Sequence, residues 1–326
     1  MESVFRPSTK LEQELALDIR ENGIEHFGRQ NRDSFVDGHY LAPAKLPPEW
    51  SELANKPLPH KVLAIAVDIY GTLLASAAGE IGSGAIAFLD EQGQNIEDKE
   101  ASEKQADKKP PVTFPADMAD KLKSIIEADH AIQKKKGIQW PEVNAPDVFA
   151  RALGMSPDDG ARACVAWECS TNRCAPMPGA LAFLECIRDT GLPLGIVSNA
   201  QFYTPIFIKE AFGLPLFPGQ EGGGLGFDME LCLWSYETGR AKPDPWMFAE
   251  LAGRLEKRAI AASNILFIGN DALNDVAAAK EAGLLTALFA GDARSFKARS
   301  GNNRVTAAQP DTLLLSWDDA RRLICT

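Results

Sequence analysis

The sequence predicts an α/β fold, a doubly wound parallel sheet that carries a mostly helical insertion. Short apolar runs rich in Val, Ile and Leu occur at residues 61–67, 192–197, 265–268 and 284–289, with a weaker one at 312–315. Runs of this length without polar alternation are typical of strands buried on both faces of a parallel sheet. Helical patterns alternate with these runs, as a doubly wound sheet requires, over residues 178–190, 245–258 and 273–282.

The number of residues between two of these strands predicts the domain organisation. Asp68 and Ser198 follow strands but lie 130 residues apart, whereas a strand–helix–strand unit needs only about 30. Apolar residues at helical spacing around 118–132, 148–153 and 161–167 indicate that the insertion is helical. We therefore predict three parts, listed here by residue number: a helical N-terminal extension and linker at 1–60, a core at 61–75 and 176–326, and an inserted domain at 76–175.

Composition and charge exclude several classes of protein. The chain has 326 residues, with 34 Lys and Arg against 45 Asp and Glu, a net charge of −11. This charge argues against nucleic-acid binding, which needs clustered cations. The sequence has neither an apolar run long enough for a membrane helix nor an apolar leader. We expect a cytoplasmic protein with a small-molecule substrate and no nucleic-acid or membrane partner. The oligomeric state and the role of residues 1–60 stay open.

The cysteines and histidines do not form a metal-binding pattern. The six cysteines lack paired C-x-x-C spacing, and the four histidines are scattered. Structural zinc sites usually show such short paired spacings. We therefore expect free thiols in a reducing compartment and no zinc site.

The strongest chemical signal is the segment VDIYGTLL, in which Asp68 directly follows an apolar strand. Ligands in such sheets bind beyond the carboxyl ends of the strands, so Asp68, Ser198 and Asp271 are expected to meet at one site. The Gly-Thr turn after Asp68 can form a nest of amides that holds an anion, which makes Thr72 a candidate substrate-binding residue. The simpler alternative for any one Asp is that it only caps a turn.

Three further elements strengthen that signal. Ser198 and Asn199 can offer a hydroxyl and an amide to a phosphate oxygen, although a helix cap is an equally simple role. Lys242 precedes Pro243 and can neutralise an anion as a point charge. Two carboxylates at the start of a helix, Asp271 and Asp275, would repel Asp68 unless a cation lay between them. Mg²⁺, which prefers oxygen ligands, suits that arrangement, although helix N-termini also favour acids.

These four motifs, DIYGTL, SN, KP and GNDALND in this order, resemble the haloacid dehalogenase (HAD) superfamily of hydrolases. The resemblance covers about residues 61–320 and implies a Rossmann-like core with a cap inserted between the first and second motifs. It implies that Asp68 is the nucleophile that takes up the transferred group covalently. Ser198 and Lys242 would then bind phosphate oxygens.

The resemblance also implies a magnesium site. Its ligands would be Asp68, the backbone carbonyl of Tyr70 and Asp271, with Asp275 supporting them from behind. Whether Asn270 or Asp271 faces the metal is left open by the sequence.

One residue departs from the phosphatases of this superfamily. They usually carry a second Asp, a general acid and base, two positions after the nucleophile, where this chain has Tyr70, as in the superfamily's 2-haloacid dehalogenases. That branch needs no metal, has a Ser-Asn arrangement in the fourth motif, and carries a Tyr where this chain has Phe248. The leading hypothesis is therefore a Mg²⁺-dependent phosphatase acting through an aspartyl-phosphate. The alternatives are a metal-independent 2-haloacid dehalogenase-like hydrolase and a catalytically weak ligand-binding protein of the same fold.

Overall fold

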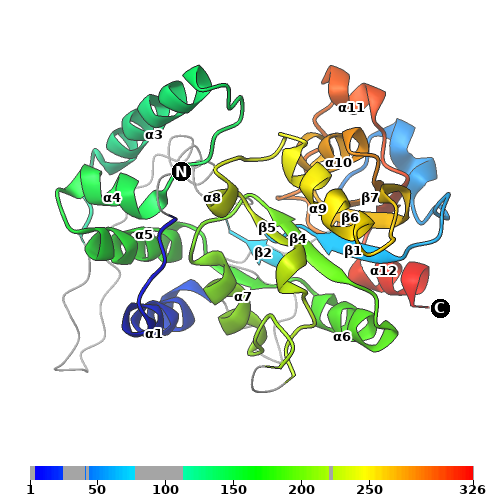
Figure 1. Ribbon diagram of the computed structural model, residues 1–326, viewed down its shortest axis with the longest axis horizontal. Coiled ribbons are helices and arrows are strands. Elements are labelled where there is room, and N and C mark those ends of the chain that lie inside the picture. The colour runs from blue at the N-terminus through cyan, green and yellow to red at the C-terminus, as the bar shows by residue number, and fades with distance from the viewer. Residues whose placement is uncertain (1–3, 25–40, 42–43, 78–112, 220–222, 326) are drawn as a thin grey trace.

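A six-stranded parallel sheet forms the centre of the computed structural model, which describes residues 4–24, 41, 44–77, 113–219 and 223–325 (Figure 1). Neighbouring strands follow the order β5 (Cys232–Trp234), β4 (Leu194–Ser198), β1 (Ala64–Val67), β6 (Ile265–Gly269), β7 (Leu285–Phe289) and β8 (Thr312–Leu314). All five pairings in the sheet are parallel. The predicted α/β class with a doubly wound sheet is confirmed.

Helices cover both faces of this sheet. Alternate residues of its strands therefore pack into different hydrophobic clusters. Ile65 and Val67 of β1 lie in one cluster, whereas Ala64 and Ala66 lie in another. The helices of the core are α6 (Ala180–Thr190), α7 (Thr204–Phe212), α8 (Ser235–Thr238), α9 (Trp246–Glu256), α10 (Ala278–Glu281), α11 (Asn303–Ala307) and α12 (Trp317–Ile324). The first cluster includes residues of α6 and α12, and the second includes residues of α9 and α10. The helices predicted at 178–190 and 245–258 are present as α6 and α9, and the one predicted at 273–282 is a π-helical turn at Ala272–Ala277 followed by α10.

Among the described residues, three helices lie between β2 (Leu74–Ser76) and β3 (Cys174–Pro176), which pair with each other as antiparallel strands. They are α3 (Met118–Lys135), α4 (Ala145–Leu153) and α5 (Pro157–Thr171), and we call them the inserted helices. Gly160 allows α4 and α5 to pack closely, because a Cβ there would lie 2.3 Å from the carbonyl oxygen of Pro146. The helical patterns predicted around 118–132, 148–153 and 161–167 are present, whereas residues 78–112 of the predicted insertion lie outside the described residues. The domain boundaries at 75 and 176 stay a prediction.

The N-terminal segment packs against both parts of the molecule. Helix α1 (Thr9–Asp18) continues into a π-helical turn at Ile19–Gly23, and both contact α5 and α7. Their apolar side chains Leu11, Leu15 and Ile19 are at most 2% exposed. The helical pattern expected near the N-terminus is therefore present, and it joins the inserted helices to the core.

The expectation that all six cysteines are free thiols is wrong for two of them. Cys186 of α6 and Cys325 just after α12 form a disulfide, with their Cα atoms 6.5 Å apart. The spacing argument missed this pair because it considers only neighbours in sequence, whereas α6 and α12 bring together cysteines 139 residues apart. The other four cysteines are buried and unpaired. Within the described residues, no helix has both the length and the apolar character needed to cross a bilayer.

Candidate active site

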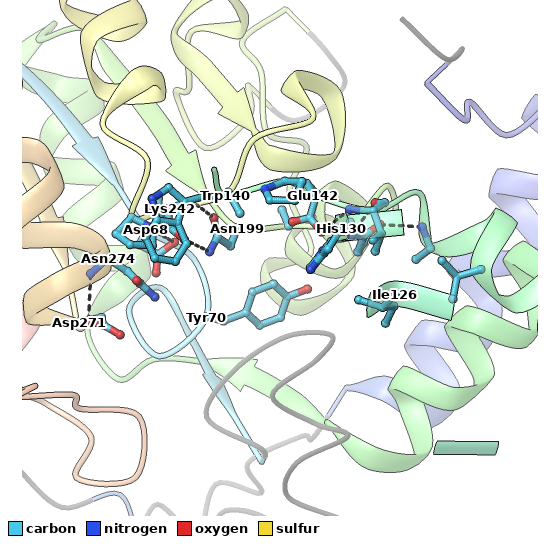
Figure 2. A pocket seen from close by; sticks show the side chains of 18 of the residues that line it. Asp68, Tyr70, Ile126, His130, Trp140, Glu142, Asn199, Lys242, Asp271 and Asn274 are labelled. Atoms are coloured by element: carbon cyan, nitrogen blue, oxygen red, sulfur yellow. Dashed lines mark hydrogen bonds and ion pairs between the residues drawn. The ribbon is translucent and has the colours of Figure 1, made fainter. Parts of the chain in front are cut away.

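A pocket of about 450 Å³ lies beyond the carboxyl ends of β1, β4 and β6 (Figure 2). Asp68, Asn199 and Asn270 line it from the sheet, and the inserted helices supply much of the opposite wall. This is the position at which a doubly wound sheet binds ligands, because loops from neighbouring strands meet there.

Asp68 stands at the end of β1, held in place by the backbone on both sides. Its amide donates to the carbonyl of Ile268 at 2.9 Å, so its position follows from the pairing of β1 with β6. Gly71 makes the turn after it with φ +77°. A Cβ at Gly71 would lie 2.4 Å from Nδ2 of Asn270, so the turn needs both the left-handed backbone and the missing side chain. The Asp68 side chain is only 11% exposed and lines the pocket.

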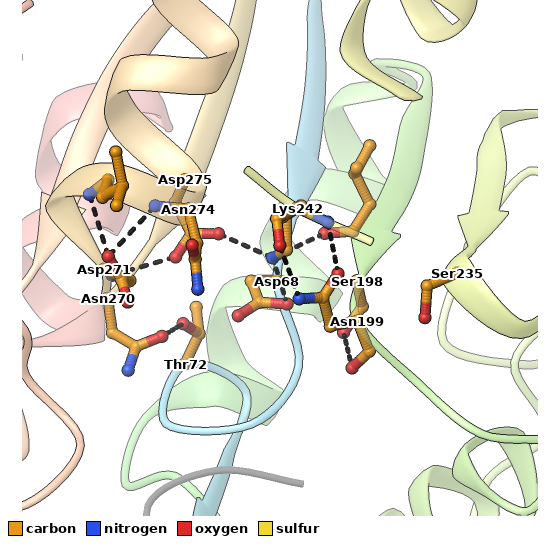
Figure 3. Close-up of polar contacts among 12 residues, drawn as sticks. Asp68, Thr72, Ser198, Asn199, Ser235, Lys242, Asn270, Asp271, Asn274 and Asp275 are labelled. Carbon is orange, nitrogen blue, oxygen red and sulfur yellow. Dashed lines mark hydrogen bonds and ion pairs between the residues drawn. The ribbon is translucent and has the colours of Figure 1, made fainter. Parts of the chain in front are cut away.

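The ammonium group of Lys242 holds Asp68 and Asp275 together (Figure 3). Its Nζ lies 2.8 Å from Oδ1 of Asp68 and 2.6 Å from Oδ1 of Asp275, and it donates a third bond to the carbonyl of Val197 at 3.2 Å. Burial alone would lower the pKa of Lys242, but Asp275 and Asp68 outweigh it and raise the pKa. Burial raises the pKa of Asp275 to about 7, although the lysine opposes that rise. With both acids ionised, this triad of one buried cation and two carboxylates carries one excess negative charge.

Asn199 orients the backbone that carries this lysine. Its Oδ1 accepts from the amide of Lys242 at 2.7 Å, and its Nδ2 donates to the carbonyl of Lys242 at 3.1 Å. Asn199 lines the pocket, whereas Ser198 and Thr72 are not part of its wall. The Ser198 hydroxyl donates to the carbonyl of Asn199 at 3.2 Å, and the Thr72 hydroxyl donates to Oδ1 of Asn270 at 3.2 Å. Both hydroxyls therefore brace the loops around the site.

The acids of the fourth motif line the pocket, but their oxygens already have partners. Oδ1 of Asp271 accepts from the amides of Leu273 and Asn274 as a helix cap, and its Oδ2 accepts from Arg299 at 2.6 Å. Oδ2 of Asp275 accepts from the amide of Asp271 at 2.9 Å, while its Oδ1 faces Lys242. The structure thus brings Asp271 and Asp275 to the same wall as Asp68, engaged in bonds within the protein.

Residues 292–299, a segment that the sequence did not single out, contact the first and fourth motifs through hydrogen bonds and an ion pair. The carbonyl of Ser295 accepts from Nδ2 of Asn270 at 2.5 Å, and the amide of Lys297 donates to the carbonyl of Asn270 at 3.0 Å. Arg299 adds its ion pair to Asp271. No local sequence motif predicts that these residues belong to the site. Their only sequence signal is a group of charged residues directly after a strand, the place where site loops occur.

Tyr70 lines the pocket between the sheet and the inserted helices (Figure 2). Its side chain is 5% exposed, and its hydroxyl lies 3.1 Å from Oγ1 of Thr204 at the start of α7. Burial raises the pKa of Tyr70 well above its ordinary value, so the phenol is neutral at physiological pH. A neutral phenol with so high a pKa is a weak proton donor and cannot serve as a base.

Glu142, which the sequence also did not single out, connects the insertion to the core. Its carboxylate accepts from Oγ of Ser235 at 2.6 Å and from Nε2 of Gln201 at 3.1 Å. Ser235 in turn accepts from the amide of Ala200 at 2.8 Å, so Glu142 braces the loop that carries Asn199. Burial raises the pKa of Glu142, while its hydrogen bonds work in the opposite direction. The carboxylate is therefore a bridge between the two walls of the pocket.

We expect Glu142→Ala to destabilise the protein by about 1–3 kcal/mol, because it removes the nearer of the two acceptors that each of the buried donors Ser235 and Gln201 has. Glu142→Gln keeps an acceptor oxygen and should cost less than half as much. Urea unfolding followed by circular dichroism measures both. Asp147→Ala, which removes an exposed carboxylate from α4, is the matched control and should change stability by less than about 0.5 kcal/mol. Equal losses in Glu142→Ala and Asp147→Ala would contradict the bridging role.

Comparison with known proteins places this site in a family context. A family model described as haloacid dehalogenase-like hydrolase matches residues 62–283. The ribulose-1,5-bisphosphate 5-phosphatase of Halopiger xanaduensis is 28% identical over 145 residues, which cover 44% of this chain and 55% of that protein. The chain thus spans about half the length of this curated relative.

Among solved structures, two similar ones are 2-haloacid dehalogenases. The enzyme from Pseudomonas syringae pv. Tomato DC3000 is 18% identical with a TM-score of 0.46, covering 80% of this chain and 97% of that one. The L-2-haloacid dehalogenase from Xanthobacter autotrophicus is 17% identical with a TM-score of 0.44, covering 81% of this chain and 98% of that one.

Proposed function

Because the chain belongs to the haloacid dehalogenase-like hydrolases, we propose that it hydrolyses a small phosphorylated metabolite with Asp68 as the covalent nucleophile. One observation carries this proposal: the Asp68 carboxylate lines a pocket while a buried lysine binds one of its oxygens. A carboxylate so oriented is a positioned nucleophile, and covalent catalysis divides one difficult hydrolysis into two easier steps.

In the first step, the other oxygen of Asp68 attacks phosphorus, the phosphorus–oxygen bond to the leaving group breaks, the departing alkoxide takes a proton from solvent, and an acyl-phosphate forms. In the second step, water attacks phosphorus and gives a proton to solvent, inorganic phosphate leaves and the carboxylate is restored. Lys242 stabilises the charge that develops near Asp68 in both steps. Asn199 keeps Lys242 in place through its two bonds to the lysine backbone.

A divalent cation is part of this proposal, because a phosphate group would meet a triad that already carries excess negative charge. Mg²⁺ usually binds through one or two carboxylates together with substrate phosphates and waters. The carboxylate of Asp68 and the backbone carbonyl of Tyr70 fit that donor set. Within the described residues, no group of three or more His, Cys, Asp or Glu is placed to hold a metal. We therefore propose that Asp271 and Asp275 support the site through Arg299 and Lys242, and that Mg²⁺ supplies charge neutralisation when bound.

We further propose that residues 76–175 act as a cap that covers the site and excludes water. The inserted helices form much of the pocket wall opposite Asp68. Glu142, which lies between α3 and α4, accepts a hydrogen bond from Gln201 in the loop after β4. The expected cytoplasmic location stays a prediction.

Tyr70 favours one second candidate, a metal-independent 2-haloacid dehalogenase-like hydrolase. In that reaction an oxygen of Asp68 displaces halide from carbon, and water then attacks the acyl carbon of the resulting ester. One oxygen of Asp68 would therefore come from solvent. Hydrolysis of an acyl-phosphate by attack at phosphorus leaves both oxygens of Asp68 in place. A single turnover in ¹⁸O-labelled water, followed by mass spectrometry of the Asp68 peptide, distinguishes the two.

The proposed function is tested with a panel of phosphate monoesters and 2-haloacids, each assayed with Mg²⁺ and with EDTA. We expect phosphate release that EDTA suppresses and that Asp68→Asn abolishes. Halide release that EDTA leaves unchanged would select the dehalogenase instead. Binding of phosphate and Mg²⁺ without any turnover would overturn both and indicate a ligand-binding protein.

Tyr70→Phe should leave turnover within about threefold of the unmodified protein. Loss of a general acid or base typically costs about 10²–10⁴-fold, but a phenol that is bonded to Thr204 and has a raised pKa is not placed to act as one. Steady-state kinetics on the best substrate of the panel measures this. A loss of about 10²-fold or more with unchanged stability would show that the Tyr70 hydroxyl takes part in proton transfer.

A further inference from the structure

The wall that the inserted helices present to the pocket is apolar and aromatic. Its members come from three helices and are Leu122, Ile126, Val148, Phe149 and Trp167. The indole of Trp167 is fixed by edge contacts with two phenyl rings, at centroid distances of 5.0 Å to Phe114 and 6.3 Å to Phe149. A rigid wall of this kind binds an apolar group at little cost in side-chain entropy.

The charged groups inside this half of the pocket are carboxylates. Glu168 is 2% exposed and accepts from the hydroxyl of Tyr203 at 3.0 Å, and Glu142 accepts from Ser235 and Gln201. No arginine belongs to the pocket wall within the described part of the chain. A second phosphate here would meet negative charge and would lack the charge-assisted donors that phosphates require.

Of the lysines in the pocket wall, Lys242 and Lys297 lie elsewhere, whereas Lys134 lies at the exposed end of α3. Lys242 is paired with two carboxylates, and Lys297 adjoins Asp271 on the sheet side, where the reacting group is held. On α3, exposure rises along one face from Leu122, which is 1% exposed, through Ile126 and His130 to the exposed Lys134. Burial and the neighbouring Lys134 lower the pKa of His130, so it is uncharged at neutral pH. Cationic charge on this helix is therefore confined to its outer end.

We propose that the substrate carries one anionic reacting group on an apolar body, aromatic or branched aliphatic, and has no second phosphate. This proposal rests on the proposed function, and it names the substrate class of the same site. A volume of about 450 Å³ lies within the range of about 300–1,000 Å³ that is usual for pockets binding small organic ligands. The curated relative is named for a bisphosphate, and this chain is expected to differ from it in that respect.

The test compares 2-naphthyl phosphate with ribulose 1,5-bisphosphate, both with Mg²⁺ present. We expect kcat/KM to be at least about tenfold higher for the naphthyl ester, the scale on which an apolar pocket discriminates. Ile126→Asn should raise KM for this ester about tenfold and leave kcat nearly unchanged, because the wall binds ground state and transition state alike. Ile125→Asn is the matched control, since Ile125 is the neighbouring half-buried residue of α3 and is not part of the pocket wall.

Isothermal titration of Asp68→Asn with the same two ligands separates this proposal from the proposed function. If the naphthyl ester binds more tightly than the bisphosphate but neither is hydrolysed by the unmodified protein, the substrate class stands and the phosphatase function fails. Tighter binding or faster hydrolysis of the bisphosphate overturns the substrate class. The same conclusion follows if neither ligand binds, or if Ile126→Asn and Ile125→Asn have equal effects on KM.

Discussion

Asp68→Asn is expected to lower kcat by at least about 10⁴-fold, the scale on which removal of a covalent nucleophile acts in hydrolases. An amide oxygen is a poor nucleophile and cannot form the acyl-phosphate, so only the positioning groups would remain. The fold should tolerate this change, because Lys242 keeps its ion pair with Asp275 and its bond to the carbonyl of Val197. Turnover of the best panel substrate and urea unfolding of the same preparation measure the two effects.

Asp319→Asn is a suitable control for this substitution. Asp319 lies on α12, outside the pocket wall. Its exposure as a whole residue is 7%, close to the 8% of Asp68 on the same measure. It should retain turnover within about twofold even though it loses charge-assisted hydrogen bonds worth about 1.5–3 kcal/mol. Residual activity of Asp68→Asn above about 1% of the unmodified protein, in fresh protein whose peptide mass excludes deamidation at position 68, would mean that another group is the nucleophile.

The strands of the sheet could be predicted because burial on both faces leaves a direct mark on the sequence. The run at 61–67 contains β1, and the run at 265–268 lies within β6. The two strands are neighbours in the sheet, which explains how residues 200 positions apart reach one pocket. Asp68 and Asp271 could be assigned to a shared edge of the sheet for this reason alone.

The partners of those residues could not be predicted, because they depend on contacts between segments with no common motif. Arg299 reaches Asp271 only because the chain after β7 folds back over the fourth motif. Glu142 reaches Ser235 across the boundary between the insertion and the core. The spacing of residues along the sequence reflects periodicity within one helix or strand. It gives no information on how one loop packs against another.

Lys242→Met should have the largest effect on stability of any single change at this site. Lys242 and Asp275 are 2% and 1% exposed, and the substitution leaves two carboxylates facing each other without their cation. Removing one partner of a buried ion pair typically costs about 3–5 kcal/mol. Urea unfolding at pH 7.5 measures this loss. Lys121→Met, which removes an exposed ion pair with Asp117 on α3, should change stability by less than about 1 kcal/mol.

A second change and the pH dependence show whether the repelling carboxylates cause that loss. Asp275→Asn added to Lys242→Met should restore part of the stability but no turnover, since the charge beside Asp68 is still missing.

Burial already raises the pKa of Asp275 to about 7 from an ordinary value of 3.8, and loss of the lysine should raise it further. A carboxyl group with a raised folded-state pKa contributes stability below its unfolded pKa and loses it as pH rises through the folded value. Lys242→Met should therefore lose stability as pH rises from about 4, and its decline should continue to higher pH than the decline of the unmodified protein. A double variant no more stable than Lys242→Met at pH 7.5 would indicate that lost packing around the lysine stem, rather than charge, dominates the effect.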